Sequence, residues 1–246
     1  MFFSIEFIKI VKRKFNYSYL LLVMLIVALL SLKLSDIAQF YSLTNEVAFV
    51  NIICRFLLVL VMFIMMLNFI FSYRQDYKTK VVSLLKLNKK ETKKSIVAVV
   101  VSSLYFLFYY LLTVTVGVAV LYFRNRDMLR ALAVNFKYNV VVYIAIVFLL
   151  LVFANLIFLL ILSVFNDTNL AISLSLLYFI GSAPLSTFLA NKGVASKYLD
   201  NSLNIVTTVF DNLTQTITYN NMLFLSLVAN IVIVFVLVLV IRIIKR

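Results

Sequence analysis

Long apolar runs separated by short polar stretches make up most of the chain. The runs lie at residues 17–34, 47–71, 96–123, 140–165, 170–189 and 222–244. About 20 apolar residues in a helix cross the roughly 30 Å hydrocarbon core of a bilayer, where only helices or closed barrels satisfy their own backbone groups. The pattern predicts an all-α membrane protein with six transmembrane helices. These would form a single transmembrane domain over residues 1–246, with both termini on one side.

The composition agrees with this class. Hydrophobic residues make up 65% of the 246 positions and charged residues 13%, whereas roughly a quarter of the residues in soluble domains are charged. Six spans leave no room for a sizeable soluble domain. The single cysteine, Cys54, excludes an internal disulfide and argues against a metal cluster built on thiols.

Residues 1–16 combine apolar and basic side chains ahead of the first run. They do not fit a cleavable signal peptide, because the basic cluster follows the apolar stretch and no small-residue cleavage site is present. On a helical wheel two faces separate, which predicts an elbow helix lying in the membrane interface. One face carries Phe3, Phe7, Ile10 and Val11, and the other carries Glu6, Lys9 and Arg13.

Residues 73–95 form a charged island between the second and third runs, and they hold eight of the 23 Lys and Arg residues. Within the island, Val81, Leu84 and Leu85 recur at i, i+3 and i+4, which on a helix makes an apolar stripe framed by cations. The pattern favours an amphipathic helix that lies on the membrane surface or in a groove of a partner protein. The alternative is a basic loop that only fixes the topology.

The distribution of basic residues predicts the orientation. Fifteen Lys and Arg residues lie in the N-terminal stretch, the island and the C-terminal tail, against six in the polar stretches of the opposite side. Because basic residues accumulate on the cytoplasmic side of membrane proteins, both termini and the island are expected in the cytoplasm. Lys33 and Arg55 remain near the outer ends of the first two spans, where long side chains reach the interface.

The sequence argues against catalysis by this chain. No Asp or Glu lies inside a predicted hydrocarbon core and the chain has no His, although proton-coupled carriers use such groups as relays. An HExxH metal site needs His, and the scattered Gly117, Gly181 and Gly193 cannot form a P-loop. We therefore expect no catalytic residue, no metal or cofactor bound by this chain, and no nucleic-acid partner. If ATP drives the protein, another chain hydrolyses it.

Polar residues inside the spans allow two interpretations. They line a passage, or they hydrogen-bond between helices at about 0.6 kcal/mol each. A cation within a span generally has a partner or faces water, which makes Arg55 the most informative of them. The candidate passage residues are Asn51, Arg55, Asn68, Ser173 and Tyr178.

The fifth run ends in Gly181-Ser-Ala-Pro184, which combines a flexible residue with a helix breaker. Residues 191–220 follow and are too polar to span, yet Leu203, Val206 and Val209 recur at helix-like intervals. This predicts a kinked fifth span followed by one or two short extracellular helices. A loose extracellular loop is the alternative.

The layout resembles the membrane subunit of ABC-2 type exporters: an amphipathic N-terminal helix, two spans, a cytoplasmic island and four more spans. In that family an acidic residue opens a short coupling helix, a Thr and a Leu pair follow, and a basic segment leads into span three. Here the corresponding residues are Asp76, Thr79, Leu84-Leu85 and the run from Lys86 to Lys94. The Gly that usually precedes the Thr is replaced by Lys78, and the spacing from Thr to the Leu pair is longer.

The resemblance implies that residues 76–87 dock in a groove of a cytoplasmic ABC ATPase, which binds ATP and Mg²⁺. A second copy or a homologous permease would complete the pathway, in a bacterial cytoplasmic membrane. The Lys, Asn, Ile and Phe bias looks like an AT-rich Gram-positive genome, and the size is similar to that of staphylococcal permeases that export phenol-soluble modulins, which are amphipathic peptide toxins. The implied docking residues are Asp76, Tyr77, Thr79, Val81, Val82, Leu84, Leu85, Leu87 and, in the loop 166–168, Asp167.

Two functions of other classes stay open. A self-contained channel or carrier would work without an ATPase. An immunity or scaffold protein would bind a peptide without moving it. Within the exporter class, export of drugs or lipids and self-protection against lantibiotics also remain, as do pairing with an identical chain and pairing with a related one.

Overall fold

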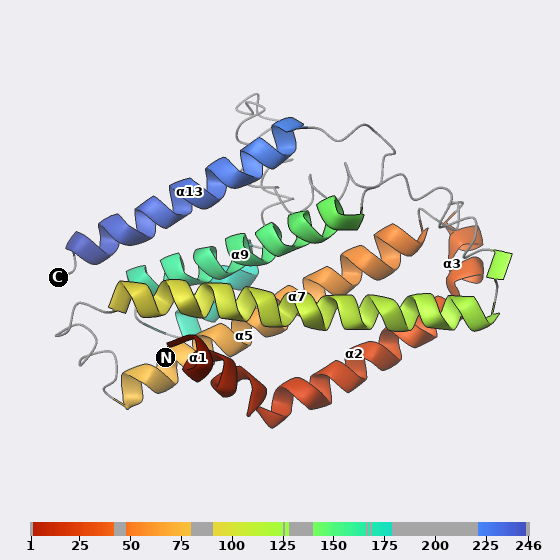
Figure 1. Ribbon diagram of the computed structural model, residues 1–246, viewed down its shortest axis with the longest axis horizontal. Helices are drawn as coiled ribbons and strands as arrows, with labels where there is room; N and C mark the ends of the chain where they lie inside the picture. Colours follow the sequence, from red (N-terminus) through yellow and green to blue (C-terminus); the bar gives the residue numbers. More distant parts are fainter. Residues whose placement is uncertain are drawn as a thin grey trace.

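The structure is a computed structural model that describes residues 2–41, 48–79, 91–124, 126–127, 140–165, 167, 169–178 and 221–244. Every element in these ranges is a helix, which confirms the predicted all-α fold for the described residues (Figure 1). Among the described residues, five helices are long and apolar enough to cross a membrane, so the protein is a multi-pass helical membrane protein. These candidate spans are Lys14–Leu32, Ile53–Asp76, Thr92–Arg124, Tyr143–Phe165 and Phe224–Ile244.

The N-terminal region forms two helices that meet at a corner. Helix α1 covers Phe2–Val11 and α2 covers Lys14–Leu32, while Arg13 between them has the extended backbone angles φ −78° and ψ 105°. The expected elbow helix over 1–16 is therefore shorter, and its last three residues begin the first long helix. At the far end of α2 the chain turns at Lys33 into the short helix α3, Leu34–Phe40.

The second and third long helices extend into the charged island. A π-helix, η1, covers Phe49–Arg55 and continues into α5, Phe56–Lys78, well past the expected end of the second span at 71. Helix α7 covers Glu91–Arg124, and its 34 residues measure about 51 Å. Residues 73–78 and 91–95 thus belong to long helices, because Lys, Arg and Gln are good helix formers and no Gly or Pro interrupts them.

Helix α9 occupies Val140–Phe165 and α13 occupies Asn221–Ile244. Between them, the described part of the expected fifth span 170–189 is the apolar helix Asn169–Tyr178, which is shorter than a membrane crossing. The rest of that span and the expected outer helices at 191–220 lie outside the described residues.

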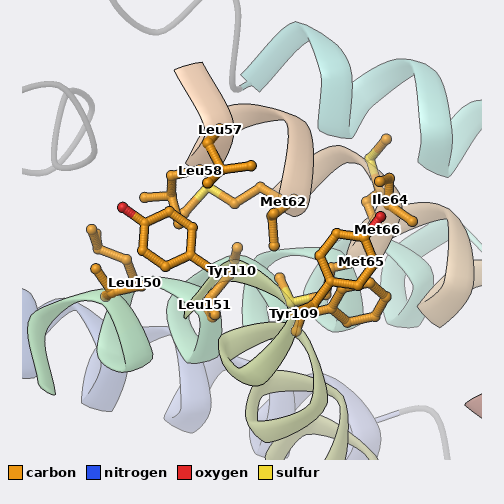
Figure 2. Close-up of a cluster of buried hydrophobic side chains, with 14 of the residues drawn as sticks. Leu57, Leu58, Met62, Ile64, Met65, Met66, Tyr109, Tyr110, Leu150 and Leu151 are labelled. Atoms are coloured by element: carbon orange, nitrogen blue, oxygen red, sulfur yellow. The ribbon is translucent and has the colours of Figure 1, made fainter. Parts of the chain in front are cut away.

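Helices α5, α7 and α9 pack around a common apolar core. Figure 2 shows leucine and methionine side chains of α5 against Tyr109 and Tyr110 of α7 and against Leu150 and Leu151 of α9. Helix α2 packs on α7 at Gly117, where an added Cβ would lie 3.1 Å from both Val27 and Ser31. Small residues allow this close approach of membrane helices.

One end of the bundle gathers α1, the end of α5, the start of α7 and the end of α13, all on the left in Figure 1. Side-chain contacts connect these segments: Lys9 with Asp76, Asp76 with Lys94, and Ser95 with Arg242. We call this end the basal end. Helix α3 and the start of α5 lie at the opposite end.

Candidate functional site at the basal end

Helix α1 turns its charged face toward the protein. Glu6 is only 3% exposed, whereas Phe3 is 51% and Phe7 44% exposed. The Phe7 ring makes an edge contact with Tyr105 of α7, with ring centroids 6.3 Å apart. The helical wheel places Glu6 and Lys9 on one face and Phe3 and Phe7 on the other, but the polar face lies against α5 and α7. Ile10, expected on the apolar face, is buried in the core.

Four side chains from three helices form a charge cluster, which we define as Glu6, Lys9, Asp76 and Lys94. The Lys9 ammonium donates hydrogen bonds to Asp76 Oδ1 at 2.6 Å and to Glu6 Oε1 at 3.1 Å. The Lys94 ammonium donates to Asp76 Oδ2 and lies 3.8 Å from Glu6 Oε1. Two cations therefore balance two anions, and the cluster joins α1, α5 and α7.

Burial makes this cluster energetically sensitive. Glu6, Asp76 and Lys94 are 3%, 7% and 8% exposed, so each has lost most of its hydration. Such a group contributes little net stability when paired, but removing one partner of a buried pair costs about 3–5 kcal/mol because the other charge stays buried. The cluster therefore fixes how α1, α5 and α7 sit against one another.

The environment changes the pKa values of two cations in this region. Burial acts to lower the pKa of Lys9, but its hydrogen bond to Asp76 and the negative charges of Glu6 and Asp76 outweigh that effect and raise the pKa above 10.5. Burial lowers the pKa of Arg13 below its usual value, although the negative charges of Glu6 and Asp76 act in the opposite direction. Both side chains stay cationic at neutral pH.

A small cavity of about 40 Å³ adjoins the cluster and is lined by Asn68, Ser72, Asp76, Lys94 and Ser102, among others. The hydroxyls of Ser72 and Ser102 are buried and have no hydrogen-bond partner within the described part of the chain. A polar cavity of this size has room for water molecules that would satisfy such hydroxyls.

A second polar network lies next to the cluster. Arg13 Nη1 donates to the backbone oxygen of Asn68 at 2.6 Å and to Asn68 Oδ1 at 3.1 Å. The Asn68 amide donates to Asn16 Oδ1 at 2.6 Å and to the backbone oxygen of Ile64 at 3.1 Å. Asn68 was expected to line a passage. In the structure its side chain connects the corner between α1 and α2 to α5, and its role beside a passage stays a prediction.

The expected ATPase-docking residues fall into three groups. The carboxylate of Asp76 is held inside the chain by Lys9 and Lys94, while Thr79 is exposed and its Oγ1 donates to the backbone oxygen of Gln75 at 2.9 Å. Asp167 is exposed and accepts the backbone N–H of Asn169 at 2.8 Å, which caps the helix Asn169–Tyr178. The side chains of Tyr77, Val81, Val82, Leu84, Leu85 and Leu87 lie outside the described residues.

The candidate passage residues are not all at one level. Arg55 is half-buried at the junction of η1 and α5, and Asn68 is 13 residues further along the same continuous helix, about 20 Å away. Ser173 is exposed and Tyr178 half-buried on the helix Asn169–Tyr178, while the side chain of Asn51 is not among the described ones.

Sequence reasoning missed Glu6 and Lys94 as site residues, and it missed a hydroxyl pair near η1. Tyr110 and Tyr143 lie with their hydroxyl oxygens 2.5 Å apart, and the Tyr110 hydroxyl also donates to the backbone oxygen of Cys54 at 3.3 Å. The π-helix η1, which contains Cys54, provides a locally wider turn at this point. For Glu6 the sequence did contain a signal. Only nine Asp and Glu residues stand against 23 Lys and Arg, so an acidic residue has many cations with which to pair.

Fold and site define a multi-pass α-helical membrane protein whose basal end is held by buried charges. Comparison with protein-family models, curated proteins and solved structures finds no match to this chain.

Proposed function

We propose that this protein is the membrane-spanning subunit of an ATP-driven exporter of the ABC-2 type, which moves amphipathic or hydrophobic peptides out of the cytoplasm or the inner leaflet. A separate cytoplasmic ATPase supplies the energy. The observation that carries the proposal is the charge cluster, because Asp76 and Lys94 join α5 and α7 at the two ends of residues 80–90. That segment contains most of the expected docking residues.

The charge cluster gives a path for mechanical coupling. A force on residues 80–90 reaches α5 and α7 together because their ends are ion-paired, and it reaches α1 through Lys9. Helices are stiff over their length, so a displacement at the basal end rotates the whole helix. Closure of the ATPase dimer would then shift the membrane helices between two arrangements, driven by the affinity for nucleotide.

The direction of the described helices supports a sixth crossing. Ser95 and Arg242 meet at the basal end, so α13 starts at the opposite end. The contact between Tyr110 and Tyr143 lies near Cys54, at the opposite end of the bundle, so α9 ends at the basal end (Figure 1). This arrangement supports the expected sixth span between Phe165 and Asn221, and two six-span chains would enclose a pathway.

The surfaces favour an apolar or amphipathic cargo. Apolar side chains of α2 and α13 face outward, and the basic residues of the island attract anionic lipid at about 1 kcal/mol each. A peptide with one apolar face would enter sideways from the inner leaflet, and the cytoplasmic side of the membrane would be the basal end.

The test is a pull-down of the tagged protein from its native membrane in mild detergent, followed by an ATPase assay with and without an amphipathic helical peptide. We expect an ATPase with a P-loop to copurify and the peptide to change its rate. Leu84→Asp combined with Leu85→Asp should abolish copurification. Phe40→Asp combined with Tyr41→Asp, which changes exposed side chains at the opposite end, should retain it.

Other outcomes would contradict the proposal in distinct ways. Purification of the protein alone, with transport in liposomes that contain no ATPase, would indicate a channel or carrier. Peptide binding without transport would indicate an immunity or scaffold protein. Copurification that survives the double Leu substitution would show that the docking segment lies elsewhere.

A further inference from the structure

Helices α7, α9 and α13 enclose an apolar groove of about 200 Å³, separate from the charge cluster. Val152 and Leu156 of α9 and Phe235 of α13 form part of its wall, and polar side chains line it only toward the basal end. Those polar residues are Thr92, Ser95 and Arg242. An apolar cavity of roughly 150 Å³ stays dry and accepts apolar guests, so the groove suits an apolar occupant with a polar end.

Among the polar residues of the groove, Arg242 has a buried charged donor whose hydrogen-bonding capacity is not satisfied by the residues that the structure describes. Its Nη2 donates to the Ser95 hydroxyl at 2.9 Å, whereas Nη1 is buried and lacks a hydrogen-bond partner among the described residues. A buried charged donor without an acceptor is strongly unfavourable. Planar guanidinium groups bind phosphate through two parallel hydrogen bonds. An anionic group at the basal end of the groove would supply the acceptor that Arg242 Nη1 lacks within the described ranges.

The length of the groove matches one leaflet of a bilayer. Its lining on α13 runs from Ile231 to Arg242, and these eleven steps of 1.5 Å cover about 16 Å. Half of the roughly 30 Å hydrocarbon core is about 15 Å. A chain held with its head group at Arg242 would therefore end near the middle of the membrane.

The groove opens sideways to the membrane. Val232 lines it and is 54% exposed, and the lining residues Ile96 and Val100 are also exposed. An extended acyl chain is narrow enough to enter from the surrounding lipid.

We propose that this groove binds an anionic phospholipid from the leaflet at the basal end, with its phosphate at Arg242 and an acyl chain between α7 and α13. The site is independent of the exporter proposal, since neither an ATPase nor a cargo takes part.

The absence of Trp from the chain allows a direct test. Val232→Trp places the only indole at the open edge of the groove, and Val236→Trp places it one turn further on α13, on an exposed residue outside the lining. Each variant is reconstituted in phosphatidylcholine vesicles that contain a small fraction of brominated phosphatidylglycerol or brominated phosphatidylcholine. Bromine quenches a neighbouring indole.

We expect brominated phosphatidylglycerol to quench the indole at 232 at about five-fold lower mole fraction than brominated phosphatidylcholine, since one cation contributes about 1 kcal/mol. The indole at 236 should respond equally to both lipids. Arg242→Gln in the Val232→Trp background should remove the difference, whereas Lys93→Gln, an exposed cation outside the groove lining, should retain it.

Equal quenching by both lipids at position 232, or a preference that survives Arg242→Gln, would overturn the proposal. A preference abolished by an added amphipathic peptide would assign the groove to peptide instead. Native mass spectrometry of the unsubstituted protein, released from mixed vesicles, checks the result without any Trp. We expect phosphatidylglycerol to be enriched over its bulk fraction, and retention in the bulk ratio would contradict the site.

Discussion

Replacing Asp76 by Asn tests whether the charge cluster holds the basal end together. The substitution keeps the size of the side chain but removes the charge that faces Lys9 and Lys94. Lys94 is then buried with only Glu6 at 3.8 Å, while Lys9 keeps Glu6 at 3.1 Å and has a half-buried side chain. Breaking a buried pair costs about 3–5 kcal/mol. We take the lower end, about 3 kcal/mol, because Lys9 still reaches solvent.

The expected result is a fall in Tm of about 6–12 °C, since 1 kcal/mol corresponds to about 2–4 °C in a chain of this length. Cys54 provides the assay, because it is the only cysteine and is buried. A thiol-reactive dye labels it only when the chain unfolds, so labelling during a temperature ramp in detergent reports Tm.

The matched control is Asp36→Asn, which removes the ion pair of Lys33 and Asp36 at 3.3 Å, whose side chains are 70% and 64% exposed. Exposed pairs contribute about 0–1 kcal/mol, so Tm should hardly change. In addition, Asp76→Asn with Lys94→Gln should cost less than the sum of the single substitutions, because neither partner of that pair is left charged and the buried Glu6 keeps Lys9 at 3.1 Å. Equal Tm values for Asp76→Asn and Asp36→Asn, or additive single effects, would refute the reasoning.

Two further predictions use the same dye assay. Gly117→Leu should destabilise the protein by about 1–3 kcal/mol, since a Cβ added at this position would lie only 3.1 Å from Val27 and Ser31. The control, Val118→Leu, changes the neighbouring exposed residue and should have little effect. Similar Tm values for the two variants would contradict this prediction. The pKa of Lys9 is raised above 10.5, so its stabilisation is complete below that pH and is lost as pH rises through the folded pKa. Lys9→Met should flatten that alkaline loss of Tm, and an unchanged profile would exclude Lys9 as its source.

The long helices could be predicted from the sequence because a bilayer fixes the length of an apolar run. The helix boundaries within the charged island could not be predicted correctly. Charged residues mark where a span leaves the hydrocarbon core, but they do not mark where the helix ends. Residues 73–78 and 91–95 therefore continue α5 and α7. The helix Asn169–Tyr178 is the described part of the expected fifth span, which stays a prediction beyond it.

The charge cluster was beyond the reach of a single sequence. A helical wheel tells which residues of α1 share a face. It does not tell whether the polar face contacts water or buried charged partners, because both environments stabilise it. Glu6 and Lys94 are 88 positions apart and meet only because α1 packs on α7. Two asparagines fit the interpretation that polar residues inside the spans hydrogen-bond between helices. The Asn155 amide donates to Ser103 at 2.9 Å, and the Asn68 amide donates to Asn16.

The orientation of α1 also constrains the order of assembly during synthesis. Its outer face suits lipid and its inner face suits buried counter-charges, so neither water nor bare membrane satisfies the helix on both sides. Glu6 and Lys9 are synthesised before Asp76 and Lys94, so the contacts that bury their charges can form only later. Helix α1 therefore takes its final place only after α5 and α7, which carry Asp76 and Lys94, have entered the bundle.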